Sequence, residues 1–454
     1  MNAKKFMKSA KSNWSKAKRT YMCRTLEDVV KAYRACTTRS EERALVKKES
    51  AHIRDLFREG DKAFRRRNVA KLLFFHMNGY EIDFGMTECI KLCASNKYKD
   101  KRIAYLGLMI LVDESEDILM LITNSLQTDL HSHDVNIVSL ALNLLSDMAS
   151  VEMVRDLLPE IDRHLHSTVP YIRKKAALAA VRAVRKLTPD ETSSILDAIP
   201  HLFESKSSGM YISAAALVST LCKKGTLDMH VFQTRVVPVV IEVCSNYLLR
   251  ERSHGSSASV SKASVKSPGV HVKLLSAMRL MLNVGLLDQH RDRVYELLTV
   301  IATTTESKTL SGCSVLYECV RAIIAMNPDQ ALWDTSISVL VNFLLHKEAT
   351  VRYIGLQELI SVADIRGTDA LLQIDGVKSK VLSSLSESDP TMRKRAAEVV
   401  YRSTNDSNCE EMVSALLDYV EKSKLPGLLR MDVGRLSPCW KNAQPQMIGR
   451  LICL

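Results

Sequence analysis

A short turn followed by an apolar helical segment returns along this sequence, and this repeat limits the fold more than any other feature. The segments KRIAYLGLMIL, VNIVSLALNLL, YIRKKAALAAV and MYISAAALVST align in one column that holds Arg102, Ile137, Arg173 and Ser213. Later segments, TVRYIGLQELI and TMRKRAAEVVY, place Arg352 and Arg393 in the same column. The aligned residues recur at nearly constant intervals along the chain, which is typical of repeated helix pairs. A single helix pair cannot bury its apolar face alone, so neighbouring pairs stack into one core. The pattern predicts an all-α fold, an α-solenoid of the HEAT/armadillo kind.

The composition agrees with long helices. The 454 residues include only 16 glycines and 11 prolines, whereas an all-β fold needs many turns. The segment LEDVVKAY places Leu26, Val29, Val30 and Tyr33 on one helical stripe. No run of 18 apolar residues and no apolar signal-peptide core appears, so we expect no membrane span. The 11 scattered cysteines form no disulfide or zinc pattern and favour a reducing compartment.

The net charge of +12 and the pI of about 9.1 predict anionic partners. These could be acidic lipids, acidic protein segments or nucleic acid. Nucleic acid is not favoured, because aromatic residues are only 6% of the chain and do not alternate with basic ones.

Changes of composition divide the chain into five parts. Residues 1–25 form a basic extension with eight Lys/Arg and no acid, which fits a disordered tail, a membrane-surface helix or a transit peptide. Residues 26–249 and 270–424 are predicted to be two parts of the solenoid. The Ser/Lys-rich residues 250–269 between them read as a loop, and residues 425–454 as an irregular tail.

Motifs for catalysis are absent from the sequence. There is no GxxxxGK[ST], GxGxxG, HExxH or GxSxG, so we expect no enzyme, no cofactor and no catalytic residue. The closest histidine pair, His164 and His166, is two residues apart and would point to different faces of a helix. We therefore expect no metal site there.

A basic cluster is the strongest candidate for binding. It begins at residue 65, and its members are Arg65, Arg66, Arg67 and Lys71. Arg67 and Lys71 are one helical turn apart, and the first two arginines lie where a helix should begin and where free N–H groups favour anions. On the first predicted helix, Lys31 and Arg34 lie off the apolar stripe, so they could converge on the same anion if the two helices pack as neighbours. The alternative is a solvated basic face with local ion pairs to Glu59 and Asp61.

Several of these segments resemble the trunk of a large adaptin of the clathrin adaptor complexes. The resemblance rests on EERALVKKESAHIR, RNVAKLLFFHMNGYEIDFGMTECIKLCAS, DKRIAYLGLMILVDE and IRKKAALAAVRAVRK, and spans about residues 26–424. The gamma type, from the adaptor of the trans-Golgi network and endosomes, is the most similar. The resemblance implies a right-handed α-solenoid that assembles with sigma-type, beta-type and mu-type subunits. It also implies a non-enzymatic role in transport, peripheral on those membranes and facing the cytoplasm.

The same resemblance implies roles for individual residues. The stretch with Arg67 and Lys71 is similar to the family's phosphoinositide-binding stretch, so Arg65, Arg66 and Lys31 are added to that site for phosphatidylinositol 4-phosphate. Arg34 resembles the residue that faces the acidic position of a dileucine cargo signal. Thr87 and Ile90 lie on the helix that resembles the Arf contact, although the family commonly has leucine in place of Thr87.

The resemblance covers the trunk alone. No hinge with clathrin-box sequences and no β-rich appendage follow residue 424, so we expect clathrin to be reached only indirectly. The alternative is another α-solenoid, such as a scaffold or a nuclear transport receptor for acidic partners. Transport receptors are usually acidic, and this chain is basic.

Overall fold

The structure is a computed structural model, and it describes residues 24–60, 62–113, 117–205, 207–225, 229–250, 267–366, 377–404 and 408–423. This part of the chain is built from helices and contains no strand, which confirms the predicted all-α class. Nearly all of the predicted basic extension (1–25), most of the predicted loop (250–269) and the whole predicted tail (425–454) lie outside the described residues.

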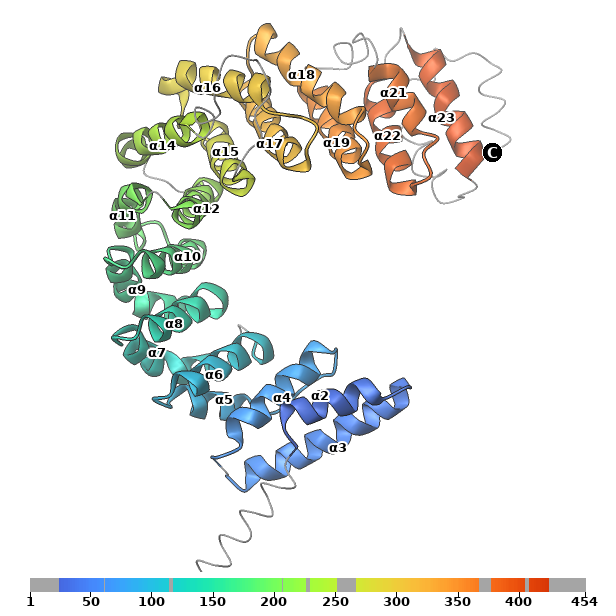
Figure 1. The fold of residues 1–454 in the computed structure, drawn as a ribbon. Helices are drawn as coiled ribbons and strands as arrows, with labels where there is room; N and C mark the ends of the chain where they lie inside the picture. Colours follow the sequence, from blue (N-terminus) through green and yellow to red (C-terminus); the bar gives the residue numbers. More distant parts are fainter. Residues whose placement is uncertain are drawn as a thin grey trace, which may run out of the picture. The chain divides into compact units, whose positions relative to one another are not determined.

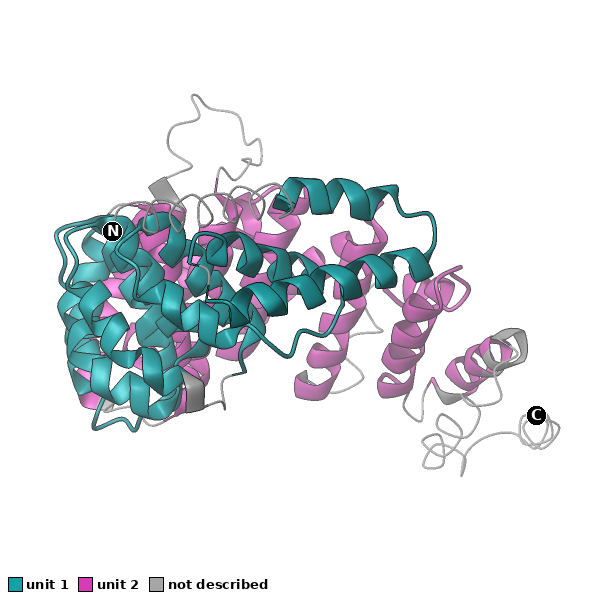
Figure 2. Cartoon of the chain, turned by 90° about the horizontal axis from the view of Figure 1, so that it is seen from below, with its two compact units in different colours: residues 1–205 teal, residues 206–454 magenta. Residues whose placement is uncertain are grey.

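Two compact units make up the chain, residues 1–205 and residues 206–454 (Figure 2). The five parts expected from composition stay a prediction, because the loop and tail that separate or end them are not among the described residues.

In the first unit, helices pack in two layers (Figure 1). One layer contains α4 (Arg65–Met77), α6 (Tyr98–Leu111), α8 (Val135–Met148) and α10 (Pro170–Lys186). The other contains α5 (Met86–Cys93), η1 (Asp117–Ile122), α7 (Thr123–Leu130), α9 (Val151–Leu165) and α11 (Ser193–Glu204). Before them, α2 (Leu26–Ala35) and α3 (Arg39–Arg58) both pack on α4.

The second unit repeats this two-layer arrangement. Its first layer contains α12 (Ser208–Lys224), α15 (Pro268–Asn283), α17 (Leu310–Met326), α19 (Ala349–Arg366) and α22 (Pro390–Arg402), each packed on the next. The remaining elements are α13 (Met229–Val231), η2 (Phe232–Val236), α14 (Val237–Arg250), η3 (Asp288–His290), α16 (Arg291–Thr304), α18 (Gln330–Leu344), α21 (Val377–Ser384) and α23 (Cys409–Ser423).

The residues of the predicted repeat column all lie near the start of first-layer helices. They are Arg102 in α6, Ile137 in α8, Arg173 in α10, Ser213 in α12, Arg352 in α19 and Arg393 in α22. The period read from the sequence is therefore the spacing between successive helices of one layer. This agreement confirms the solenoid prediction within each unit.

Short polar residues set where many of these helices begin. The Thr25 side chain accepts a hydrogen bond from the Asp28 backbone N–H, and the Asp28 carboxylate accepts one from the Thr25 N–H, which is a capping box. Asp389 caps α22, and Pro390 follows at the first helical position, where a missing N–H costs nothing. These local signals stop one helix and start the next at the repeat period.

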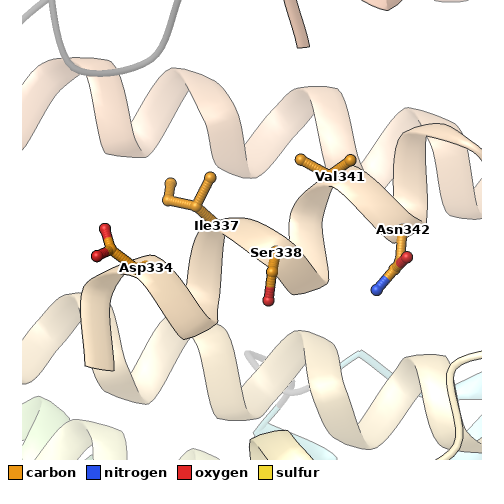
Figure 3. A pocket seen from close by; sticks show the side chains of 5 residues that line it. All are labelled: Asp334, Ile337, Ser338, Val341 and Asn342. Atoms are coloured by element: carbon orange, nitrogen blue, oxygen red, sulfur yellow. The ribbon is translucent and has the colours of Figure 1, made fainter. Parts of the chain in front are cut away.

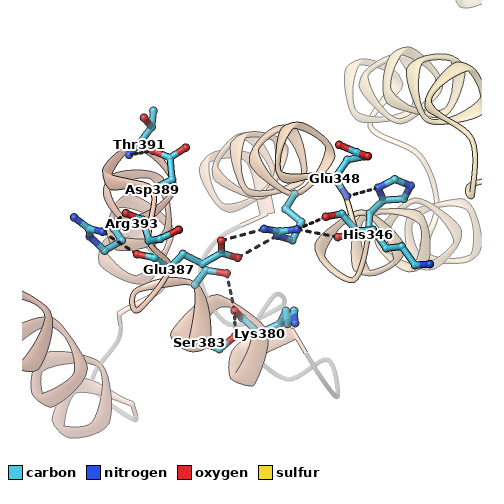
Figure 4. Close-up of polar contacts among 12 residues, drawn as sticks. His346, Glu348, Lys380, Ser383, Glu387, Asp389, Thr391 and Arg393 are labelled. Carbon is cyan, nitrogen blue, oxygen red and sulfur yellow. Dashed lines mark hydrogen bonds and ion pairs between the residues drawn. The ribbon is translucent and has the colours of Figure 1, made fainter.

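Arg352 and Arg393 explain why the column favours arginine near the end of the second unit. The Arg352 guanidinium donates to both carboxylate oxygens of Glu387, at 3.1 and 3.0 Å, and to the carbonyl oxygens of His346 and Lys347. Arg393 donates to the carbonyl oxygens of Glu387 and Ser388, each at 2.8 Å (Figure 4). Arg352 thus donates hydrogen bonds to carbonyl oxygens in the turn before its own helix and to a carboxylate in the turn of the next repeat.

Close packing between layers depends on a glycine in α6. A Cβ atom added to Gly107 would lie 2.6 Å from the Cys89 sulfur in α5 and 3.4 Å from a methyl group of Val69 in α4. Three helices approach at this point only because no side chain separates them.

No single helix in the described ranges has both the length and the apolar character of a membrane span. The pair α15 and α16 satisfies both conditions only when joined across a 119° bend. The core of the second unit buries their apolar residues, including Leu274, Met278, Leu298 and Ile301.

Candidate functional site on the N-terminal helices

The basic cluster lies on α4 and on the two helices that flank it. As expected, α4 begins at Arg65, and its first turn contains no acidic residue. Phe64, at the N-cap, supplies no side-chain hydrogen bond to the helix start. Three arginines beside the positive end of a helix repel that end, so the surrounding structure must supply anions.

A carboxylate from α5 meets the first of these arginines. The Arg65 guanidinium donates to Glu88, whose side chain is 6% exposed and which also accepts from Lys91 at 2.5 Å. The Arg65 side chain is itself only 12% exposed. Arg65 therefore already has a counterion within the protein itself.

Lys71, predicted to bind an anion together with Arg67, lies inside the protein. Lys71 is 0% exposed, and its ammonium group lies 3.4 Å from the carboxylate of Glu49 on α3. Arg24 approaches the same carboxylate at 3.6 Å. Lys71 therefore links α4 to α3 and does not reach the surface. A buried charge needs a paired and hydrogen-bonded environment, and the Glu49 carboxylate supplies it here.

Arg66 and Arg67 are the accessible cations at the start of α4. The Arg66 side chain is 48% exposed and lies 3.4 Å from Asp100. Arg67 is half-buried, with its guanidinium 5.2 Å from the ring centroid of Phe64. The predicted cluster therefore divides into Arg65 and Lys71, which are enclosed, and Arg66 and Arg67, which face solvent.

Helix α2 packs on α4, as the convergence of Lys31 and Arg34 requires. The ring of Tyr33 meets that of Phe74 edge to face, with centroids 5.4 Å apart. Lys31 is paired with Glu27 at 2.8 Å, but both side chains are at least 70% exposed, so this pair contributes little. Arg34 is exposed and makes no ion pair with any residue that the structure describes.

Thr87 and Ile90 both lie on α5, three residues apart. Thr87 is exposed and Ile90 is half-buried, whereas their neighbours Cys89 and Leu92 are buried. The two residues thus contribute to one solvent-facing strip of α5. Their predicted contact with Arf stays a prediction.

The counterions of Arg65, Arg66 and Lys71 were not anticipated from the sequence. Three of the cluster's cations pair with Glu49, Glu88 and Asp100, carboxylates that differ from the local candidates Glu59 and Asp61, whose pairing stays a prediction. The three paired carboxylates are 22 to 34 positions from their cations. Asp61 lies outside the described residues. Sequence spacing within one helix predicts contacts only between residues three or four positions apart. It therefore could not indicate these carboxylates, which lie on other helices.

Buried ionisable groups elsewhere in the first unit serve packing. Lys101 donates to Asp129 at 2.8 Å and to the carbonyl oxygen of Cys93 at 2.6 Å, and the Tyr105 hydroxyl donates to Asp129 at 2.6 Å. Burial raises the pKa of Cys93 to about 12, and that of Cys89 likewise. Thiols in this state are poor nucleophiles.

The histidine pair occupies two different environments. His164 is buried and its Nε2 lies 2.9 Å from the carbonyl oxygen of Leu130, whereas His166 is exposed and its ring packs against that of His201. Within the described ranges, no group of three or more His, Cys, Asp and Glu side chains is arranged to hold a metal ion.

A cavity of about 410 Å³ lies on the second unit, along one face of α18. Asp334, Ile337, Ser338, Val341 and Asn342 line it (Figure 3). The two aliphatic side chains, Ile337 and Val341, point toward a neighbouring helix in this view. No cationic residue is among these five, so the cavity does not extend the basic cluster.

Comparison with known proteins supplies a relationship over most of the chain. The family described as "Adaptin N terminal region" matches residues 42–430. AP-1 complex subunit gamma-1 of Arabidopsis thaliana is 38% identical over 399 residues, which are 88% of this chain and 44% of that protein. AP-1 complex subunit gamma-like 2 of Homo sapiens is 33% identical over 407 residues, 90% of this chain and 50% of that protein. The chain thus spans about half the length of these relatives.

Solved structures give a similarity of fold. A homology model of the full-length AP-3 complex in an intermediate open conformation matches with a TM-score of 0.53 and 23% identity. The match covers 79% of this chain and 57% of the compared chain. At that identity, the comparison supports the helical solenoid architecture alone.

Proposed function

The chain belongs to the adaptin N-terminal region family, and from this premise we propose that it is the trunk of a gamma-type large subunit of a clathrin-associated adaptor complex. In this role it acts in vesicle-mediated protein transport between the trans-Golgi network and endosomes, as a peripheral protein on their membranes. The observation that carries the proposal is the family match over residues 42–430, together with the stacked helical layers. The match favours this role over that of a nuclear transport receptor.

We further propose that the subunit assembles with sigma-type, beta-type and mu-type subunits. A solenoid offers an extended surface that one partner can follow along several repeats. Clathrin would then be reached indirectly, through the assembled complex. The proposal assigns the chain a binding and assembly role, with no catalytic step.

For the membrane, we propose that Arg66, Arg67 and Lys31 contact the phosphorylated headgroup of phosphatidylinositol 4-phosphate. Their exposure and the packing of α2 on α4 support this assignment. Arg65 and Lys71 would act indirectly, because their ion pairs with Glu88 and Glu49 fix the position of α4. Thr87 and Ile90 on α5 remain the proposed contact with Arf.

For cargo, we propose that Arg34 faces the acidic position of a dileucine signal. Its exposed guanidinium without an ion pair among the described residues supports this role, since an Arg–carboxylate pair needs an unoccupied donor.

Co-expression with a sigma-type subunit tests the proposed function. We expect a stable one-to-one complex in pull-down and size-exclusion chromatography. A chain that elutes alone or as aggregate, under conditions in which a relative's trunk binds the same subunit, contradicts the proposal. In the complex, Arg34→Ala should weaken capture of a dileucine peptide at least tenfold, and unchanged capture would remove Arg34 from the cargo site.

A further inference from the structure

A groove of about 210 Å³ lies between α3 and the chain segment that follows α4. Five residues of α3 line one side of it: Arg43, Val46, Lys47, Ser50 and Arg54. Their spacing of three, four and seven residues places them on one face of the helix. Residues 80–84 form the opposite wall, and we call this feature the α3 groove.

One end of the α3 groove has cations without counterions among the described residues. Arg43 and Lys47 are exposed, lie one helical turn apart, and make no ion pair with any residue in the described ranges. Glu81, on the opposite wall, is the acidic residue that lines the groove. Among the residues that line the groove here, two cations face one carboxylate, while the nearby Glu42 carboxylate accepts from the Tyr80 hydroxyl.

The other end of the groove is already neutralised. Arg54 donates to the carboxylate of Asp83 at 2.8 Å, and its guanidinium lies 4.1 Å from the ring centroid of Phe84. A ligand anion therefore gains more at Arg43 and Lys47 than at Arg54.

The floor between these ends is mostly apolar. Val46 is 6% exposed and Ile82 is 9% exposed. Ser50 is 7% exposed, and its hydroxyl makes no hydrogen bond to any residue that the structure describes. Ser50 thus provides a donor and acceptor inside the groove.

Tertiary contacts hold the opposite wall in place. The Tyr80 hydroxyl lies 3.4 Å from the Glu42 carboxylate, and Phe84 packs edge to face on Phe57. The wall ends at Gly85, which has a φ of +100° and whose missing Cβ makes room for Leu72. A left-handed backbone enclosed in this way fits only glycine. These contacts fix the position of the wall, so the groove is formed before a ligand binds.

We propose that the α3 groove binds a short extended segment of another protein that carries an acidic residue beside a small apolar one. The carboxylate would lie between Arg43 and Lys47, the apolar side chain on Val46 and Ile82, and a backbone group on Ser50. A peptide satisfies this combination of cations, apolar floor and hydroxyl, whereas an inositol headgroup has nothing to place on the apolar floor. Because a cavity of ~150 Å³ encloses a molecule the size of benzene, a groove of 210 Å³ has room for an apolar side chain.

Selection from a phage library of random nine-residue peptides, with the immobilised full chain as bait, tests the proposal. We expect enrichment of peptides with Asp or Glu next to a valine-sized residue. The enriched peptide, labelled with fluorescein, should bind in fluorescence anisotropy at least tenfold more weakly to Arg43→Glu with Lys47→Glu than to the unaltered chain. Enriched peptides without acids, or equal binding to this variant, would overturn the proposal.

A matched control removes the effect of net charge. Arg39→Glu with Lys48→Glu makes the same charge change at exposed residues of α3 that do not line the groove. This control should bind the peptide within twofold of the unaltered chain, and an equal loss in the control would reduce the effect to general electrostatics. Ser50→Ala should weaken binding by about two- to tenfold, the loss of one neutral hydrogen bond, with unchanged circular dichroism.

Two kinds of vesicle distinguish the peptide from a lipid: phosphatidylcholine alone, and phosphatidylcholine mixed with a minor fraction of phosphatidylinositol 4-phosphate. We expect the Arg43 and Lys47 reversals to lower binding to the mixed vesicles no more than the control pair does. A selective loss of vesicle binding, with peptide binding unchanged, would assign the groove to lipid and overturn the proposal.

Discussion

Lys71 and Glu49 form an ion pair inside the first unit, and such a pair is costly to break from one side. Each charge lost its hydration when α3 packed on α4, so each depends on the other for compensation. Arg24, at 3.6 Å, gives Glu49 a second and more exposed cation. The pair therefore fixes how α4 lies on α3, and with it the direction in which Arg66 and Arg67 point.

Removing Lys71 alone should destabilise the protein more than removing both charges. We expect Lys71→Met to lower the free energy of unfolding by about 3 kcal/mol, because Glu49 is left buried with only the partial compensation of Arg24. Glu49→Leu with Lys71→Met should recover most of this loss. Urea denaturation followed by circular dichroism measures both, with Lys48→Met on α3 as the exposed control. A double variant as unstable as the single one would contradict this account of the pair.

The buried side chain of His164 should make the free energy of unfolding depend on pH. Burial lowers the pKa of His164 below its ordinary value, and the hydrogen bond to the carbonyl oxygen of Leu130 only partly opposes this. As the pH falls below about 6.5, the unfolded chain binds a proton that the folded chain excludes, so stability falls.

The melting temperature, measured from pH 8 to pH 5, tests this prediction. The unaltered chain should lose stability toward pH 5 relative to His164→Gln, whose side chain keeps a donor and does not titrate. His166→Gln, at the exposed histidine two residues later, should follow the unaltered chain. Parallel curves for the unaltered chain and His164→Gln would exclude His164 as the cause.

Single-residue contacts were the least predictable level from the sequence. That α4 starts at Arg65 follows from its apolar pattern, which is a local property. That Lys71 is enclosed depends on Glu49, 22 residues earlier on another helix. The Ser50 hydroxyl, which makes no hydrogen bond within the described residues, likewise has no sequence signal, because serine at that spacing usually bonds its own helix backbone.

Helices, by contrast, follow from local patterns. The stripe of Leu26, Val29, Val30 and Tyr33 predicts α2, and the structure begins that helix at Leu26 behind the Thr25 cap. The repeat column predicts the spacing of the first layer because each helix pair solves the same packing problem as the previous one. The two-layer arrangement could be predicted for the same reason, although the close approach at Gly107 could not.

Gly107 tests how tightly α5 and α6 are packed. Gly107→Ala places a methyl group 2.6 Å from the Cys89 sulfur, so we expect a loss of about 1–3 kcal/mol from overpacking. Cys89→Ala in the same chain removes the obstructing sulfur and should restore part of the loss, limited by the remaining contact with Val69. Thermal unfolding of the two single variants and the double variant measures this coupling. Additive losses would show that the two positions do not meet.

The whole chain has a net charge of +12, which agrees with a role at anionic membranes. Net charge alone does not identify the residues that contact the membrane. We predict that Arg66→Glu with Arg67→Glu weakens binding to phosphatidylinositol 4-phosphate vesicles at least tenfold, since each basic residue near an anionic surface contributes about 1 kcal/mol. Lys347→Glu with Lys394→Glu, at two exposed residues of the second unit, is the control of equal charge. Equal losses in a vesicle sedimentation assay would assign the effect to net charge.

Packing between neighbours has a consequence for how such a chain reaches its folded state. In each unit a first-layer helix packs on the next one, a single repeat further along the chain, and arginines such as Arg352 tie a helix only to the adjacent turn. A segment leaving the ribosome therefore finds its partners within the most recently made portion of chain. Each helix pair can add to a preceding ordered template during synthesis, and a substitution in one repeat should delay only the repeats that dock directly on it.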